Sequence, residues 1–268
     1  MIRSANRTRR TLPIAGGAAA VLLALSACSS ADTASDRGPS SSELSGSVTV
    51  FAAASLQESF EKLGATFEKR HPGTEITFSF GGSDSLAAGI NSGAPADVFA
   101  AASPRTMALV ADRKATAGTP ATFVRNRLQI ATLPGNPDRI TSLRDLAKPG
   151  LKVVLCDRTV PCGAAAQKAL RAGGLKVTPA SYEQDVKSAL TKVELKEADA
   201  AVVYRTDVRA AGDKVDGVDF PESADAVNDY PIALLEHARN PETAKAFIAL
   251  VRSAEGQKVL SGAGFLKP

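Results

Sequence analysis

The chain has 268 residues, of which 44% are hydrophobic and 22% are charged, a composition typical of a globular protein. Its formal charge is +4, but Arg3, Arg7, Arg9 and Arg10 lie in the first 27 residues, which contain no acid, and without them 28 basic and 28 acidic residues remain. We therefore expect no basic surface for nucleic acid, and the two His and three Cys leave few residues for a metal centre or for His-dependent catalysis.

Residues 1–27 have the organisation of an export signal. A basic stretch ends at Arg10, and an apolar run follows over residues 15–25, which is shorter than the roughly 20 residues that a transmembrane helix needs. Residues 25–28 (Leu-Ser-Ala-Cys) resemble the lipobox of bacterial lipoproteins, and this resemblance implies cleavage before Cys28 and a lipid on its thiol. A secreted protein without a lipid is the alternative. Residues 8–12 also loosely resemble a twin-arginine signal, so the export route stays open.

Residues 28–46 are rich in Ser and have no apolar pattern, so we expect a flexible tether there. Strands and helices alternate along the rest of the chain. Strands are predicted at 48–52, 75–80, 96–100, 128–131, 152–156, 198–204 and 229–235, and helices begin near residues 55, 83, 103, 142, 163, 185 and 240. Repeated β–α alternation predicts an α/β protein whose mostly parallel sheet carries helices on both faces.

Hydroxyl side chains stand where predicted strands lead into helices, most clearly at Ser55 and Ser83. A helix start presents unpaired N–H groups and the positive end of the helix dipole, so several such turns that converge would form an anion site without charged side chains. Each serine also has a simpler interpretation as a helix cap, and Ser55 with Glu58 has the spacing of a capping box.

Signatures of enzymes are missing from the sequence. It contains no Gly-x-Ser-x-Gly, no phosphate-binding P-loop and no His-Glu-x-x-His, and His71 and His237 lie in polar turns typical of surface residues. Cys156 and Cys162 are close in sequence, and outside the cytoplasm such a pair favours a disulfide. A zinc site would require more ligands than this pair supplies.

Several segments together resemble the molybdate-binding proteins of ATP-driven transporters. The matching segments are residues 50–56, 82–87, 93–99, 160–163, 183–186, 201–204 and the stretch from 256 to 265. The resemblance implies a two-lobed periplasmic-binding-protein fold of type II, with the ligand in the cleft between the lobes. It places residues 47–124 and 232–268 in lobe 1 and residues 125–231 in lobe 2, with a hinge near Asn126 and Tyr230.

The same resemblance implies a set of neutral ligands for the oxyanion. They are the hydroxyl groups of Ser55, Ser83 and Tyr204 and the backbone N–H groups of Cys162 and Val186. Ser85 is an alternative to Ser83, because the register of that segment is less secure. Ser103 ends a second Phe-Ala-Ala-Ala-Ser segment but has no ligand role in the family, so we interpret it as a helix cap. No cofactor and no cation ligands are expected.

The function implied by the resemblance is that of a monomeric, lipid-anchored receptor outside the cytoplasm. It would bind molybdate or tungstate and deliver it to an ABC permease in the cell membrane, without catalysis and without a nucleic-acid partner. One alternative is a receptor for another oxyanion such as sulfate or thiosulfate. A second alternative, from a different class, is a secreted hydrolase with Ser55 or Ser83 as its nucleophile.

Overall fold

The computed structural model describes residues 43–268. The predicted export signal, Cys28 and residues 28–42 of the predicted tether lie outside the described residues. No helix in the described part of the chain is both long enough and apolar enough to span a bilayer.

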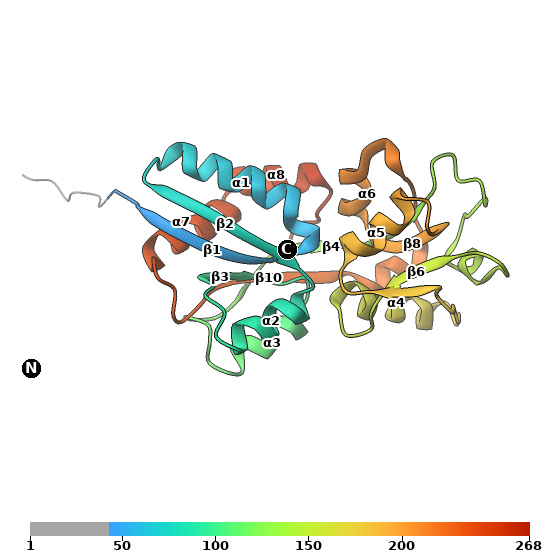
Figure 1. Ribbon diagram of the computed structural model, residues 1–268, viewed down its shortest axis with the longest axis horizontal. Helices are drawn as coiled ribbons and strands as arrows, with labels where there is room; N and C mark the ends of the chain where they lie inside the picture. Colours follow the sequence, from blue (N-terminus) through green and yellow to red (C-terminus); the bar gives the residue numbers. More distant parts are fainter. Residues whose placement is uncertain (1–42) are drawn as a thin grey trace, which may run out of the picture. The chain divides into compact units, whose positions relative to one another are not determined.

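Two five-stranded sheets organise the described residues (Figure 1). The first sheet has the order β2 (Thr74–Gly81), β1 (Gly46–Ala53), β3 (Val98–Ala100), β10 (Asn228–Leu234) and β4 (Ala121–Asn126). The second has the order β7 (Ser181–Glu183), β6 (Val153–Cys156), β8 (Ala200–Tyr204), β5 (Leu128–Thr132) and β9 (Asp216–Val218). We call each sheet with its helices a lobe.

Each sheet is mixed. In both, two pairs of neighbouring strands are parallel and two are antiparallel. The prediction of α/β lobes flanked by helices is confirmed, but the expected excess of parallel pairs is not observed. The antiparallel pairs arise because β10 and β5 each follow a crossing between the lobes. Each of these strands runs opposite to both of its neighbours in the sheet.

Helices cover the two faces of the first sheet. α1 (Gln57–Arg70), α7 (Pro241–Arg252) and α8 (Ala254–Ala263) pack on one face, and α2 (Ser83–Asn91) and α3 (Pro104–Ala111) on the other. Successive strand residues point to opposite faces, so in β3 Val98 and Ala100 join the cluster under α1 and Phe99 the cluster under α2. The predicted apolar stripe of α1 is buried, including Phe60 and Phe67, whose rings both contact Phe247 edge-on.

The second lobe carries α4 (Pro161–Ala172), α5 (Val186–Glu194) and α6 (Arg205–Ala211). Short 3₁₀ helices complete the described residues: η1 (Ala54–Leu56), η2 (Leu143–Ala147), η3 (Gly212–Lys214) and η4 (Pro221–Ala226). Every residue of the central strand β8 is buried. This strand therefore holds its last residue, Tyr204, in a fixed position at the edge that faces the first lobe.

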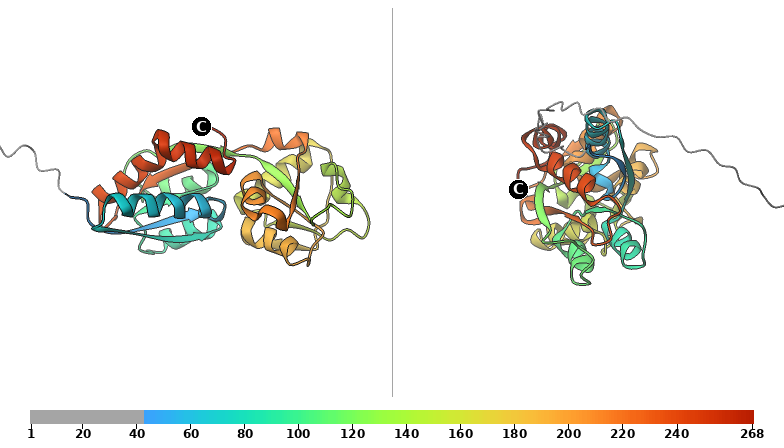
Figure 2. Two further views of the ribbon diagram at one scale, coloured as in Figure 1. Left: turned by 90° about the horizontal axis from the view of Figure 1, so that it is seen from above. Right: turned by 90° about the vertical axis from the view of Figure 1, so that its left-hand side faces the viewer.

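The chain crosses between the lobes twice. Figure 2 shows the two connections between the lobes. The chain leaves the first sheet after Asn126 and returns at Asn228, and these two residues are paired neighbours in the antiparallel ladder of β4 and β10. The lobe boundaries predicted at residues 124/125 and 231/232 fall inside these two strands, which pair within the first sheet over their whole length. Each connection is thus a single residue long: Arg127 links β4 to β5, and Val227 links η4 to β10.

Candidate functional site

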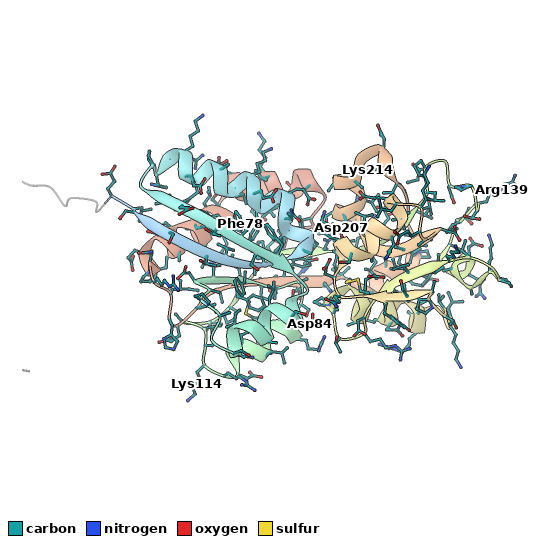
Figure 3. The ribbon with its side chains drawn as sticks, in the orientation of Figure 1. Phe78, Asp84, Lys114, Arg139, Asp207 and Lys214 are labelled. Carbon is teal, nitrogen blue, oxygen red and sulfur yellow. A yellow bond between two sulfur atoms is a disulfide. The ribbon has the colours of Figure 1, made fainter. Side chains whose placement is uncertain are left out.

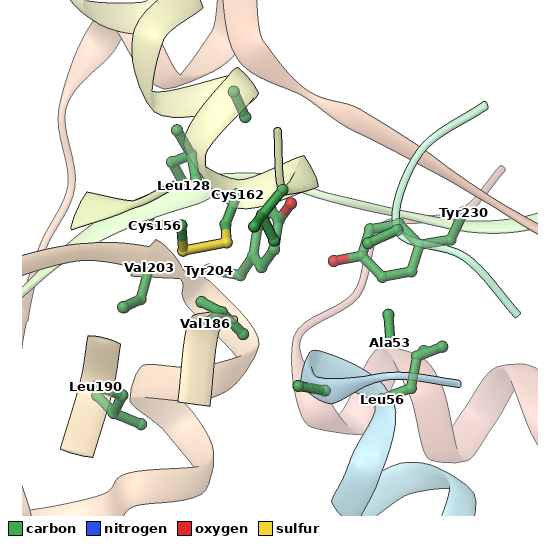
Figure 4. Close-up of a cluster of buried hydrophobic side chains, with 14 of the residues drawn as sticks. Ala53, Leu56, Leu128, Cys156, Cys162, Val186, Leu190, Val203, Tyr204 and Tyr230 are labelled. Carbon is green, nitrogen blue, oxygen red and sulfur yellow. A yellow bond between two sulfur atoms is a disulfide. The ribbon is translucent and has the colours of Figure 1, made fainter. Parts of the chain in front are cut away.

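A pocket lies between the two lobes, and residues from both contribute to it. Its lining consists of Ala53, Ala54, Ser55, Gly81, Gly82, Ser83, Ala102, Val160, Pro161, Cys162, Asp185, Val186 and Tyr204. All five residues predicted as ligands line this one pocket, although they are spread over 150 positions of the sequence. Figure 4 shows Cys162, Val186 and Tyr204 together on one side and Tyr230 across from them.

Three α-helices begin at the pocket. Ser83 is the first residue of α2, Cys162 the second of α4 and Val186 the first of α5. The first four N–H groups of a helix have no acceptor inside the helix and carry the positive end of its dipole. The pocket is therefore surrounded by N–H donors that need an acceptor from outside their own helices.

The hydroxyl of Ser83 is a hydrogen-bond donor toward the pocket. The backbone N–H of Ala102 donates to Ser83 Oγ over 3.0 Å, so this oxygen already accepts one hydrogen bond and its own proton is free to donate. The alternative candidate, Ser85, is exposed and is not part of the pocket lining.

Ser55 lies in η1 between β1 and α1 and is buried. Its predicted capping box with Glu58 is wrong, since α1 begins at Gln57 without a side-chain cap. Ser55 Oγ instead lies 2.9 Å from Tyr230 Oη, in a hydrogen bond across 175 positions of sequence. A long-range partner has replaced the local one, and Ser55 is one of the residues that line the pocket. Ser103, by contrast, caps α3 as predicted by accepting from Thr106 N–H.

Tyr204 ends β8 and is fully buried, with its hydroxyl accepting from Asn228 Nδ2 over 2.8 Å. Burial raises the pKa of Tyr204 well above its usual value, and burial likewise raises the pKa of Tyr230. Both phenols therefore keep their protons throughout the physiological range and act as neutral O–H groups.

Charged side chains are scarce around the pocket. Among the described residues of its lining there is no Lys, Arg or His, and Asp185 is the one acid. Asp185 caps α5, and its two oxygens accept from Ser188 N–H at 2.9 Å and from Ser188 Oγ at 3.1 Å. Nowhere in residues 43–268 do three or more His, Cys, Asp or Glu gather as a metal site would require. The pocket thus offers neutral hydrogen-bond donors.

A disulfide shapes one wall of the pocket. Cys156 at the end of β6 is bonded to Cys162 in the first turn of α4, with an S–S distance of 2.10 Å. The turn between them is so tight that a Cβ on the next residue, Gly163, would lie 1.9 Å from the carbonyl oxygen of Asp157. The disulfide occupies the side chain of Cys162 and leaves its backbone N–H for the pocket.

Residues behind the pocket were missed as functional candidates. Asn126 and Asn228 hydrogen bond to the phenols of Tyr230 and Tyr204, and neither lines the pocket itself. The available signal was an Asn in each crossover strand, because Asn is depleted in strands. Sequence reasoning placed Asn126 and Tyr230 only near the hinge.

Two α/β lobes, two single-residue crossings and a donor-lined pocket between the lobes define a solute-binding protein. The chain belongs to the bacterial extracellular solute-binding protein family, whose model matches residues 48–266. It is 42% identical over 255 residues to the molybdate-binding protein ModA of Mycobacterium tuberculosis, covering 94% of this chain and 97% of that protein. It is also 32% identical to the putative ABC transporter substrate-binding lipoprotein YvgL of Bacillus subtilis, over 91% and 93% of the two chains. The periplasmic molybdate-binding protein of Azotobacter vinelandii shares its fold, with a TM-score of 0.73 at 20% identity, over 82% of this chain and 99% of that one.

Proposed function

We propose that this chain is an extracytoplasmic receptor that binds molybdate and hands it to an ABC permease. The observation that carries the proposal is the gathering of three hydroxyl groups and the starts of helices α4 and α5 in one pocket whose lining has no cationic side chain and one acid, Asp185. The relatives named as molybdate-binding proteins support the choice of ligand.

A fully deprotonated tetrahedral oxyanion has four oxygens that only accept hydrogen bonds, so its site should contain only donors. Ser55, Ser83 and Tyr204 supply O–H donors, and Cys162 and Val186 supply N–H donors. Tungstate has the same shape and charge and is bound in the same way. Molybdenum enters as the oxyanion, so the protein needs no cation ligands and no cofactor.

Closure of the two lobes over the anion completes the site, because Ser55 and Ser83 come from the first lobe and the other three donors from the second. The two crossings at Arg127 and Val227 form the hinge. The closed, liganded form then docks on the permease as a monomer.

The resemblance of residues 25–28 to a lipobox supports a position at the membrane surface. Cys28 carries the lipid, residues 1–27 are the export signal and the residues between Cys28 and β1 are the tether, which ends before Gly46 because Gly46 begins β1. The relative from Bacillus subtilis named as a lipoprotein supports this assignment.

We also propose that the protein is not an enzyme. The hydrogen-bond partners of the Ser55 and Ser83 side chains are Tyr230 Oη and the Ala102 N–H, and neither group is a general base for a serine nucleophile. A secreted hydrolase would need His or another base at one of these hydroxyls.

Isothermal titration calorimetry of the purified protein with molybdate, tungstate and sulfate tests the proposal. We expect one site for molybdate and tungstate and much weaker binding of sulfate. Equal affinity for sulfate, or no binding of any of the three, would overturn the assignment.

Ser55→Ala and Tyr204→Phe each remove a hydrogen bond to a charged ligand, which is worth about 1.5–3 kcal/mol, so each should lower molybdate affinity by roughly 10- to 150-fold. The matched control is Ser103→Ala, in the second Phe-Ala-Ala-Ala-Ser segment. It removes a helix cap worth about 1 kcal/mol of stability and should leave the affinity unchanged.

A further inference from the structure

Each hydroxyl group of the pocket has another hydrogen-bonding group behind it. Asn228 Nδ2 lies 2.8 Å from Tyr204 Oη, Ala102 N lies 3.0 Å from Ser83 Oγ, and Tyr230 Oη lies 2.9 Å from Ser55 Oγ. A hydroxyl carries one proton, so its direction depends on whether the group behind it donates or accepts.

Asn228 donates, because a second contact orients its amide. Nδ2 also lies 3.4 Å from the carbonyl oxygen of Pro161, which can only accept. The nitrogen of the amide therefore faces both Pro161 and Tyr204. The Tyr204 oxygen accepts from Asn228, and the phenol proton is left for the pocket.

Asn126 orients Ser55 through Tyr230 in the same way. Asn126 Oδ1 accepts from the backbone N–H of Arg127 at 3.0 Å, so Nδ2 faces Thr206 Oγ1 at 2.8 Å and Tyr230 Oη at 3.4 Å. Tyr230 accepts from Asn126 and donates to Ser55 Oγ, and the Ser55 proton is then free for the pocket. Ser83 needs no such chain, since the Ala102 N–H can only donate.

We propose that Asn228 and Asn126 are positioning residues that hold the hydroxyls of Tyr204 and Ser55 as donors, and that they thereby make the pocket reject oxyanions that carry a proton. The inference rests on the proposed function, because it concerns the selectivity of the same site. Hydrogen phosphate has one O–H and needs one acceptor, whereas every oriented hydroxyl here presents a proton. The one acid of the lining is Asp185, and its two carboxylate oxygens accept hydrogen bonds from the N–H and the hydroxyl of Ser188.

The test replaces the donor amide of Asn228 by an acceptor of the same size. In Asn228→Asp the new carboxylate can only accept, so Tyr204 donates to it and presents a lone pair to the pocket. Molybdate affinity should fall by roughly 10- to 150-fold, the range for losing a hydrogen bond to a charged ligand. Inorganic phosphate at pH 8 should lose no affinity beyond the charge repulsion that both dianions share, because the lone pair of Tyr204 can accept its O–H. The molybdate-to-phosphate affinity ratio therefore falls at least about tenfold.

The molybdate-to-phosphate affinity ratio separates the direction of the Tyr204 hydroxyl from the effects of added charge and lost packing. The added negative charge repels both dianions alike and cancels in the ratio. Asn228→Leu, which offers neither donor nor acceptor, should weaken molybdate binding while phosphate stays excluded. Asn91→Asp adds the same charge at the end of α2, where the amide contacts the Leu109 carbonyl, and should change neither affinity.

An equal loss for molybdate and phosphate in Asn228→Asp, or no change in either, would overturn the inference while leaving the proposed function intact. If the wild type itself binds no molybdate, the proposed function fails first. Should Asn228→Asp not fold, as judged by circular dichroism, Asn126→Asp makes the same test through Tyr230 and Ser55. An unchanged ratio in that variant counts against the inference equally.

Discussion

The ammonium group of Lys187 in the second lobe forms an ion pair with the carboxylate of Glu58 in the first, with an N–O distance of 2.5 Å. Glu58 lies in the first turn of α1 and Lys187 in the first turn of α5. Both helices begin within two residues of a pocket residue. Lys187 also lies 3.7 Å from the buried carboxylate of Asp207. One lysine thus joins a carboxylate of each lobe beside the pocket.

We expect Glu58→Gln to weaken molybdate binding by a few-fold. The side chains of Glu58 and Lys187 are 51% and 22% exposed, and such exposed pairs contribute about 0.2–1 kcal/mol. Titration calorimetry measures the loss, which should shrink at high salt because screening weakens the pair. The control is Glu61→Gln on the same helix, whose partner is Gln57. An identical loss in the control would contradict the role of the interlobe pair.

Asp207, which is labelled in Figure 3, should make the stability of the protein depend on pH. Burial raises its pKa to about 7 from a usual 3.8, with Glu58 adding to the rise and Lys187 and the Tyr204 N–H opposing it. The pKa is higher in the folded state, so the stabilising contribution is present below about pH 4 and is lost as the pH rises through 7.

Wild type should therefore lose stability relative to Asp207→Asn between pH 4 and 7, by up to about 1.4 kcal/mol for each pH unit. Urea unfolding of both proteins across this range measures the difference, and groups common to both cancel. Parallel pH profiles for the two proteins would show that Asp207 does not titrate in this range.

Gly82→Ala should impair lobe closure. A Cβ on Gly82 would lie 2.5 Å from the carbonyl oxygen of Gln184 in the second lobe and 2.8 Å from Asp84 Oδ1. Relieving such overpacking costs about 1–3 kcal/mol, so molybdate affinity should fall roughly 5- to 150-fold. Without ligand, the melting temperature should stay the same, because an open form avoids the clash.

Gly89→Ala is the matched control for Gly82→Ala. Gly89 lies in α2, the helix that directly follows Gly82, and its Cβ would meet neighbours at an ordinary 3.8 Å. We expect unchanged affinity and equal or higher stability, since Ala favours helix more than Gly. Unchanged affinity in Gly82→Ala as well would show that closure tolerates the extra methyl group.

The disulfide should matter more for stability than for binding. Cys156→Ala combined with Cys162→Ala removes the closure of a short loop, which is worth about 2 kcal/mol in the chain-entropy model. The backbone N–H of residue 162 remains, so molybdate affinity should change by no more than a few-fold. Chemical unfolding and calorimetry measure the two effects separately. A folded double variant without molybdate binding would contradict the backbone role of Cys162.

Much of the local structure could be predicted because its causes are local. The apolar stripe of α1, with Phe60 and Leu63, and the cap at Ser103 depend on residues three or four positions apart. The capping box at Ser55 failed for the opposite reason, since its hydroxyl bonds to Tyr230 in another strand. The antiparallel strand pairs of each sheet were not predicted, because they follow from the path of the chain between the lobes.

The sequence by itself determined which hydroxyls and backbone groups stand at helix starts, since the order of strand, turn and helix is written in neighbouring residues. Only the tertiary structure decided that Ser55, Ser83, Cys162 and Val186 meet in one pocket with Tyr204, which ends a strand. It also decided which way the hydroxyls point, through Asn228 behind Tyr204 and Asn126 behind Tyr230. The direction of a hydroxyl proton depends on its hydrogen-bond partner, and here those partners lie 19 to 175 positions away, where only folding brings them into contact.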